Sequence, residues 1–133
     1  MENFGDRKNV YYYTRDHEWI SFRGSVAYVG VCAFKLTGIK QIQQIEFEQI
    51  NNFKKAGELL AIVHSGEYKI PIYMPVDGKI YVCNDELSGD NRNILIQQPE
   101  QAGWVAIIFP ASPDEREGLL LHEQYLLNNK PVF

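Results

Sequence analysis

Short apolar runs separated by turn residues recur along the chain from residue 10 onward. Runs with period-two alternation, or runs bounded by Gly, Pro, Asn, Asp and Ser, are typical of strands. The pattern predicts a mostly β protein with strands at residues 10–13, 19–22, 25–31, 44–48, 59–63, 70–74, 79–82 and 104–109.

The inward-facing positions of these strands predict the hydrophobic core, because alternate side chains of such strands point to the same side. With 133 residues, 45% of them hydrophobic, the chain is long enough for one core and too short for two domains. We therefore expect one domain over residues 1–133, with residues 1–9 flexible. The predicted core residues are Val29, Val31, Leu60, Ile62, Ile72, Ile80, Val82, Val105 and Ile107.

Two helical segments are predicted beside the strands. Residues 34–39 give a short, weakly patterned one. In residues 114–127, Pro113 precedes acids in the first turn, and leucines recur as on a helix docked by one face. Gly118 inside this segment costs about 1 kcal/mol and is a candidate break between a turn and a helix. Residues 85–93, rich in Asp, Asn, Ser and Gly, predict a loop or short turn.

Residues 56–82 carry the most informative pattern of the chain. Two apolar strands, 59–63 and 70–74, flank a polar segment, and residues 75–78, Pro-Val-Asp-Gly, turn into a third strand. This predicts a hairpin with an exposed tip, and a helical or buried tip would contradict it. The tip residues are Ser65, Gly66, Glu67 and Tyr68.

This hairpin resembles that of the lipoyl and biotinyl carrier domains, in which a Gly-Glu opens the hairpin and a Pro-x-x-Gly closes it. Further residues narrow the likeness to the H protein of the glycine cleavage system, over about residues 11–127. The resemblance implies a barrel-sandwich hybrid of two small antiparallel sheets, with a short helix and a C-terminal helix. The residues that carry it are Tyr13-Thr14, His17-Glu18-Trp19, Gly30, Ala56-Gly57-Glu58, Asn84, Leu87 and Gly103-Trp104.

The chain departs from that family where the cofactor is attached. The family carries lipoate on a lysine eight residues before the hairpin proline, and here that position is Glu67. A carboxylate cannot form the amide that attaches lipoate, so no cofactor is expected. The neighbours His64, Tyr68 and Lys69 differ from the family too, as do Lys40-Gln41 and Gln43-Gln44. The resemblance therefore implies a non-enzymatic relative that acts through protein contacts.

Lys69 keeps an alternative open. It is the only lysine near the tip, and a shift of two residues preserves its face of the strand while moving it about 6–7 Å from the turn. In this alternative the protein is a working carrier of the glycine cleavage system. Covalent lipoate on Lys69 would shuttle an aminomethyl group between enzymes.

Charge and composition exclude several other classes. The formal net charge is −4 and the sequence pI is about 5.3, with no basic stripe, so no nucleic-acid partner is expected. No signal-peptide pattern and no apolar run of membrane length occurs, which predicts a cytoplasmic monomer without a membrane partner. Cys32 and Cys83 are isolated and read as small buried hydrophobes.

The other polar residues do not form a catalytic or metal site by spacing. His17 and Glu18 are expected to brace the first strands, and His64 and His122 are not brought together. Ser65 has no orienting acid or oxyanion hole in the pattern. In the run of three tyrosines at 11–13, at least one ring is expected to be exposed. No catalytic or metal-binding residue is predicted.

Three classes of function remain at this stage. One is the non-lipoylated H-protein-like domain. Its partners would be the family's own: glycine decarboxylase, aminomethyltransferase, dihydrolipoamide dehydrogenase or a lipoate ligase. The second is the carrier through Lys69, and the third is an unrelated small enzyme, for which the sequence offers no acid–base or nucleophile set. The predicted surface for a partner is the tip, His64, Ser65, Gly66 and Tyr68.

Overall fold

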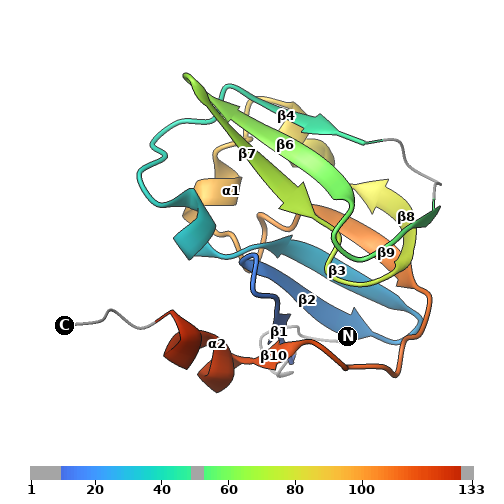
Figure 1. Cartoon of the computed structure of the whole chain (residues 1–133). Helices are drawn as coiled ribbons and strands as arrows, with labels where there is room; N and C mark the ends of the chain where they lie inside the picture. The colour runs from blue at the N-terminus through green and yellow to red at the C-terminus, as the bar shows by residue number, and fades with distance from the viewer. Residues whose placement is uncertain (1–9, 49–52, 130–133) are drawn as a thin grey trace, which may run out of the picture.

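The computed structural model describes residues 10–48 and 53–129, which form two antiparallel sheets (Figure 1). The smaller sheet has the order β4-β6-β7, formed by Gln44–Phe47, Leu59–Ser65 and Tyr68–Tyr73. The larger has the order β10-β1-β2-β3-β9-β8-β5, formed by Leu120–Leu121, Tyr12–Tyr13, Glu18–Arg23, Val26–Val31, Ala106–Pro110, Gly78–Cys83 and Phe53–Lys54. The predicted mostly β fold of two antiparallel sheets is confirmed. The expectation for residues 1–9 lies outside the described residues.

Each of the eight predicted strands matches an observed strand, and the ends agree to within two residues. Their alternation and bounding turns were therefore sufficient to find them. Two further strands, β5 and β10, have two residues each and were not predicted. Strands this short carry no periodicity, and pairing with β8 and β1 is what makes them extended.

The helices differ more from the sequence prediction. The predicted helix at 34–39 is a single 3₁₀ turn, η2 (Ala33–Leu36). The loop at 85–93 contains another, η3 (Asp85–Ser88), and the unpredicted α1 (Ile94–Gln97) follows it. The predicted C-terminal helix is confirmed, but it does not extend over 114–127, and the candidate break at Gly118 is real. Gly118 adopts a φ of +83°, β10 pairs with β1, and only then does α2 (His122–Asn128) begin.

The core lies between the facing sides of the two sheets. Six of the predicted core residues are buried there: Val29, Val31, Leu60, Ile72, Ile80 and Val105. The other three, Ile62, Val82 and Ile107, are only half-buried. Register shifts between Leu59 and Ala61 and between Ile80 and Val82 explain the first two, because one extra residue reverses the alternation. The prediction for Ile107 assumed that the alternation starting at Val105 continues, but Val105 lies before β9 begins. Within β9 the inward-facing residues are Ala106 and Ile108.

A second, aromatic cluster closes the side of the molecule where α2 docks. It contains Tyr13, Trp19, Cys32 and Tyr125, and the Tyr13 and Tyr125 rings stack with centroids 4.8 Å apart. The expectation of an exposed ring at 11–13 was wrong, since all three tyrosines are at least half-buried. β10 and α2 pack on β1 and cover them, which the local sequence does not show.

The cysteines behave as predicted. Both are free, Cys32 buried and Cys83 half-buried. Burial raises the pKa of Cys32 to about 12 and that of Cys83 to about 11, so both stay protonated thiols at neutral pH. Among the helices of the described residues, none has the length and apolar character needed to span a membrane.

Candidate functional site

The β6–β7 hairpin projects from the smaller sheet to a tight turn at the edge of the molecule (Figure 1). Ser65 pairs with Tyr68, which leaves Gly66 and Glu67 as the two residues of the turn. Gly66 has a φ of +60° and the φ of Glu67 is negative. This is the pattern of a type II′ turn. Glu67 is therefore at the apex, and its side chain is exposed.

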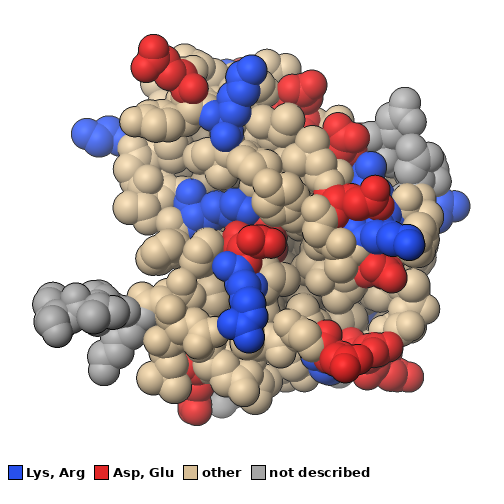
Figure 2. All heavy atoms as spheres, viewed as in Figure 1, with Lys and Arg blue, Asp and Glu red and all other residues tan. Residues whose placement is uncertain are grey.

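Lys69 lies on the strand and not in the turn, because its cross-strand partner is His64. Its side chain is exposed, and Tyr68 beside it is the most exposed aromatic residue of the tip, at 67%. Figure 2 shows acidic and basic atoms side by side where Figure 1 has the end of this hairpin. The tip thus presents both charges around an aromatic ring.

The loop before β4 holds the tip in place. The Ser65 hydroxyl donates to the Gln41 carbonyl at 2.6 Å, and the Gly66 N–H donates to Gln43 Oε1 at 2.9 Å. The Gln43 N–H in turn donates to the carbonyl of His64 at 2.9 Å. The only sign of this contact in the sequence is the departure from the family at Lys40-Gln41 and Gln43-Gln44. Three hydrogen bonds to this one loop make the turn a preorganised surface.

His64 contacts Glu46 of β4 and not Glu67, the acid closest to it in the sequence. Its Nε2 lies 3.0 Å from Oε1 of Glu46 on β4, and both side chains are partly exposed. Between the tip and the loop at 38–43 lies an open hollow of about 340 Å³. The sequence-predicted residues His64, Ser65, Gly66, Glu67, Tyr68 and Lys69 are thus all brought together at one end of the smaller sheet.

At the other end of the hairpin a buried carboxylate joins the two sheets. Glu18 of β2 is 1% exposed, and its Oε2 accepts from the Tyr73 N–H of β7 at 3.1 Å and forms an ion pair with Lys35. Its Oε1 accepts from the Thr14 hydroxyl at 2.9 Å. Burial raises the pKa of Glu18, and the hydrogen bond and charge of Lys35 oppose that rise. With every contact internal to the chain, Glu18 is structural.

His17 is also internal. Its φ of +70° is in the left-handed region, which is uncommon for a residue with a Cβ. The ring stacks on Phe34 with centroids 4.4 Å apart, and its Nδ1 lies 2.8 Å from the Tyr125 hydroxyl. Burial lowers the pKa of His17. These contacts tie β2 to η2 and α2, which agrees with the bracing role expected for His17 and Glu18.

The described residues bring together no catalytic set. The Ser65 hydroxyl is engaged by a backbone carbonyl and has no histidine partner among the hydrogen bonds of the described chain. In residues 10–48 and 53–129, no three His, Cys, Asp or Glu side chains are grouped so as to hold a metal ion. The tip therefore offers contact side chains and an exposed lysine amine, and the described residues assemble no Ser–His pair or metal site there.

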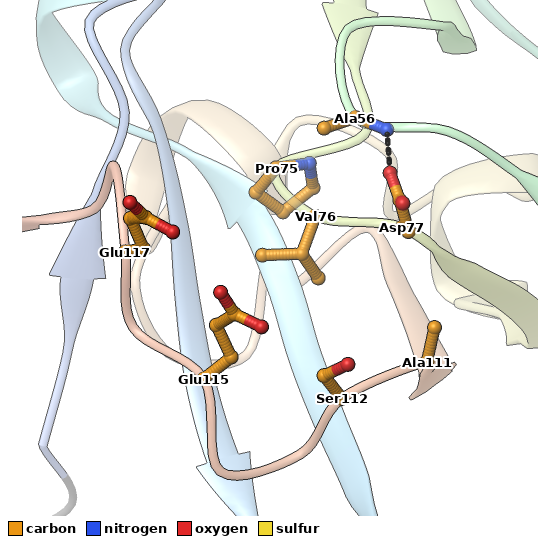
Figure 3. Close-up of a pocket in the computed structure, with 8 residues that line it drawn as sticks. All are labelled: Ala56, Pro75, Val76, Asp77, Ala111, Ser112, Glu115 and Glu117. Atoms are coloured by element: carbon orange, nitrogen blue, oxygen red, sulfur yellow. Dashed lines mark hydrogen bonds between the residues drawn. The ribbon is translucent and has the colours of Figure 1, made fainter.

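A more enclosed hollow of about 230 Å³ lies at the opposite end of the hairpin, near Pro75 (Figure 3). Glu115 and Glu117 line one side, and apolar Val76 forms part of the wall. Asp77 is engaged elsewhere, since its Oδ1 accepts from the Ala56 N–H at 2.7 Å. Ser112 also lines it, but among the side-chain hydrogen bonds of the described residues none joins the Ser112 hydroxyl to Glu115 or Glu117, and no histidine is among the lining residues.

Comparison with known proteins gives one consistent family. The family model described as glycine cleavage H-protein matches residues 11–131. The glycine cleavage system H protein of Caulobacter vibrioides is 34% identical over 113 residues, 85% of this chain and 93% of that protein. That of Phenylobacterium zucineum is 32% identical over 108 residues, 81% of this chain and 88% of that protein. The crystal structure of an H protein from Mycobacterium marinum superposes with a TM-score of 0.78 over 92% of this chain and 98% of that one, and at 22% identity shows the shared fold.

Proposed function

Because the chain belongs to the glycine cleavage H-protein family, we propose that it is an H-protein-like domain without lipoate that acts through protein–protein contacts. H proteins are lipoyl carriers and not catalytic enzymes, and this chain is accordingly not an enzyme. One observation carries the proposal. At the apex of the hairpin turn, where the family's lysine is expected, the residue is Glu67.

The chemistry of attachment supports this reading. Lipoate is joined to a protein through an amide on the Nζ of a lysine, and a carboxylate has no nitrogen with which to form it. Lys69, the lysine nearest to Glu67 in the sequence, is on β7 opposite His64 and two residues beyond the expected position. An attachment enzyme that reads the geometry of the turn would find a carboxylate at the apex and the amine lower on the strand.

The surface of the tip supports a role in binding. Tyr68 is 67% exposed and directly follows the turn, which is hydrogen-bonded to Gln41 and Gln43. Exposed tyrosines on rigid elements bury large areas at small entropic cost and recur among the residues that dominate interfaces. Glu67 reverses the charge of an unmodified lysine, so a partner that accepts a lysine at the apex meets an opposing electrostatic preference here.

The alternative is a working carrier lipoylated on Lys69. One observation favours it: the Lys69 side chain is exposed beside the turn. In that case lipoate would be the cofactor, and the protein would pass an aminomethyl group among the enzymes of glycine cleavage.

Intact-mass spectrometry after co-expression with a lipoate ligase separates the two readings. We expect the wild-type protein to gain no lipoyl group, and Glu67→Lys to gain some if the flanking residues permit recognition. Lys69→Arg is the matched control, since it keeps the charge and removes the reactive amine. Efficient modification of the wild type that is lost in Lys69→Arg would overturn the proposal and establish the carrier.

Binding assays test the interaction half of the proposal. Glycine decarboxylase, aminomethyltransferase, dihydrolipoamide dehydrogenase and a lipoate ligase would each be titrated against the unmodified protein by calorimetry. We expect at least one to bind, and Tyr68→Ala to weaken that binding about tenfold, the equivalent of 1.4 kcal/mol. Absence of binding to all four, or binding that Tyr68→Ala leaves unchanged, would count against the tip as the interaction surface.

The proposed organisation is a single domain over residues 1–133, present as a monomer in the cytoplasm. It is supported by the family match to residues 11–131 and by the size and charge of the chain. Sedimentation equilibrium and cell fractionation test it. A stable dimer, or recovery of the protein in a membrane fraction, would contradict this part of the proposal.

A further inference from the structure

The outer face of the seven-stranded sheet carries three large exposed aromatic side chains close together. Phe53, Tyr81 and Phe109 are 57%, 53% and 40% exposed. The register places Phe53, Lys79 and Phe109 in one row across β5, β8 and β9, and the Tyr81 and Phe109 rings lie 5.0 Å apart. Lys79 is therefore surrounded by aromatic rings at the surface.

The face continues toward β2. Tyr28 pairs with Ile107 of β9, both are half-buried, and the Arg23 guanidinium lies 4.2 Å from the centre of the Tyr28 ring. Arg23 and Lys79 thus flank a continuous aromatic and aliphatic surface. This surface, Arg23, Tyr28, Phe53, Lys79, Tyr81, Ile107 and Phe109, is called the outer aromatic face below.

The charge of this face is one-sided. Within the strands of the seven-stranded sheet the only acid is Glu18, which points inward and is buried. Lys54, the third cation of these strands, is paired with Glu48, whereas no ion pair among the described residues engages Lys79. The strands of this face thus carry cations and no exposed acid, although the net charge of the whole chain is −4.

We propose that the outer aromatic face is a second docking surface, for a protein partner that presents apolar side chains bordered by carboxylates. Aromatic residues and arginine are enriched, and acids depleted, at the centres of protein interfaces. Carboxylates of the partner would meet Lys79 and Arg23, and its apolar residues would cover Tyr81 and Phe109. The face is on the side of its sheet opposite to the core and the hairpin sheet, so the tip and this surface can be occupied together.

Two other occupants fit the observations less well. A second copy docked by two-fold symmetry would bring this positive face against itself, with no carboxylate of the sheet to compensate. A nucleic acid requires many phosphate contacts, and this face offers two cations on a negatively charged protein.

The test uses NMR of the ¹⁵N-labelled full chain and three probes. These are a short peptide alternating Glu and Leu, a matched peptide alternating Lys and Leu, and a single-stranded oligouridine. We expect the Glu peptide to shift the amide signals of Gly78–Cys83 and Ala106–Pro110 and the other two probes not to do so. Stronger binding of the Lys peptide or of oligouridine, no shift with any probe, or shifts confined to the tip would overturn the proposal.

Two variants and a control sharpen the result. Lys79→Glu and Phe109→Ala should each weaken binding of the Glu peptide about fivefold to tenfold, the range of a contact worth about 1 kcal/mol. Lys40→Glu makes the same charge change near the tip and should leave this binding unchanged. If Lys40→Glu weakened binding of the Glu peptide equally, the effect would come from the net charge of the protein. That result would overturn the assignment to this face. A concentration-dependent dimer that Phe109→Ala abolishes would also overturn it, in favour of a second copy.

Discussion

At the base of the β6–β7 hairpin, Ile72 and Met74 are buried and the Tyr73 N–H donates to the Glu18 carboxylate, whereas at the tip Glu67 and Tyr68 are exposed. The base is attached to the core and to the other sheet. The tip is attached by hydrogen bonds to a single loop, and its side chains point to solvent. The same hairpin therefore contains a region on which folding depends and a region on which it does not.

In the proposed function, this difference explains how the family's fold can be kept while the residue at the attachment position changes. Substituting an exposed residue in a two-residue turn changes the free energy of unfolding little, provided that the glycine with positive φ remains. Substituting the base would leave buried polar atoms unpaired or create a cavity. The tip can thus change its chemistry without changing the fold, and its residues inform about function more than about stability.

The largest effect is expected for Glu18→Ala. It leaves Lys35 nearly buried without its partner and removes the acceptor of the Tyr73 N–H and the Thr14 hydroxyl. We expect a loss of about 4 kcal/mol in the free energy of unfolding, measured by urea denaturation. The double variant Glu18→Leu, Lys35→Met should recover part of this loss, because an apolar pair replaces the charged one. No recovery would show that the unpaired charge is not the cause.

The second prediction compares the two ends of the hairpin directly. Ile72→Ala should cost about 3 kcal/mol, because it creates a cavity in the core under the base. Tyr68→Ala, which removes a larger side chain at the tip, should change stability by less than about 0.5 kcal/mol. Urea denaturation of both variants measures the difference. Similar losses in the two would break the contrast between base and tip.

A smaller effect is expected for Gly66→Ala in the turn. At a φ of +60° an alanine costs about 1 kcal/mol, since its Cβ disfavours the left-handed region. Gly89→Ala is the matched control, because Gly89 has a φ of −110° and open space around it. Thermal denaturation should show a loss only for Gly66→Ala. An equal loss at Gly89 would mean that the backbone conformation is not responsible.

The smallest effect is a pH dependence at His17. Burial lowers its pKa, so the folded protein binds this proton less readily than the unfolded chain, whose ordinary value is about 6.5. The contribution of His17 to stability is complete above that pH and decreases as the pH falls below it. Melting temperatures at about pH 8 and pH 5.5 should therefore differ less in His17→Asn than in the wild type. Asn tolerates the positive φ, and an unchanged difference would exclude His17 as the source.

Local sequence was sufficient for the turn of the candidate site and insufficient for its supports. Gly66-Glu67 between two apolar strands predicts a two-residue hairpin turn, because only local backbone geometry is involved. The contacts from Gln41 and Gln43 to the tip, and from Glu18 to Tyr73, join residues that lie far apart in the sequence. Such contacts depend on how the strands pair, which no local pattern encodes.

The sequence by itself determined the two-sheet β fold, the hairpin and the identity of its apex residue, since alternation, turn residues and spacing are local properties. The tertiary structure decided which side chains of the strands are buried, because two register shifts reverse the alternation at Ile62 and Val82. It also decided where α2 begins, since pairing of β10 with β1 keeps Leu120–Leu121 extended despite their helical pattern. In each case a long-range contact outweighed a local preference of about 1 kcal/mol or less.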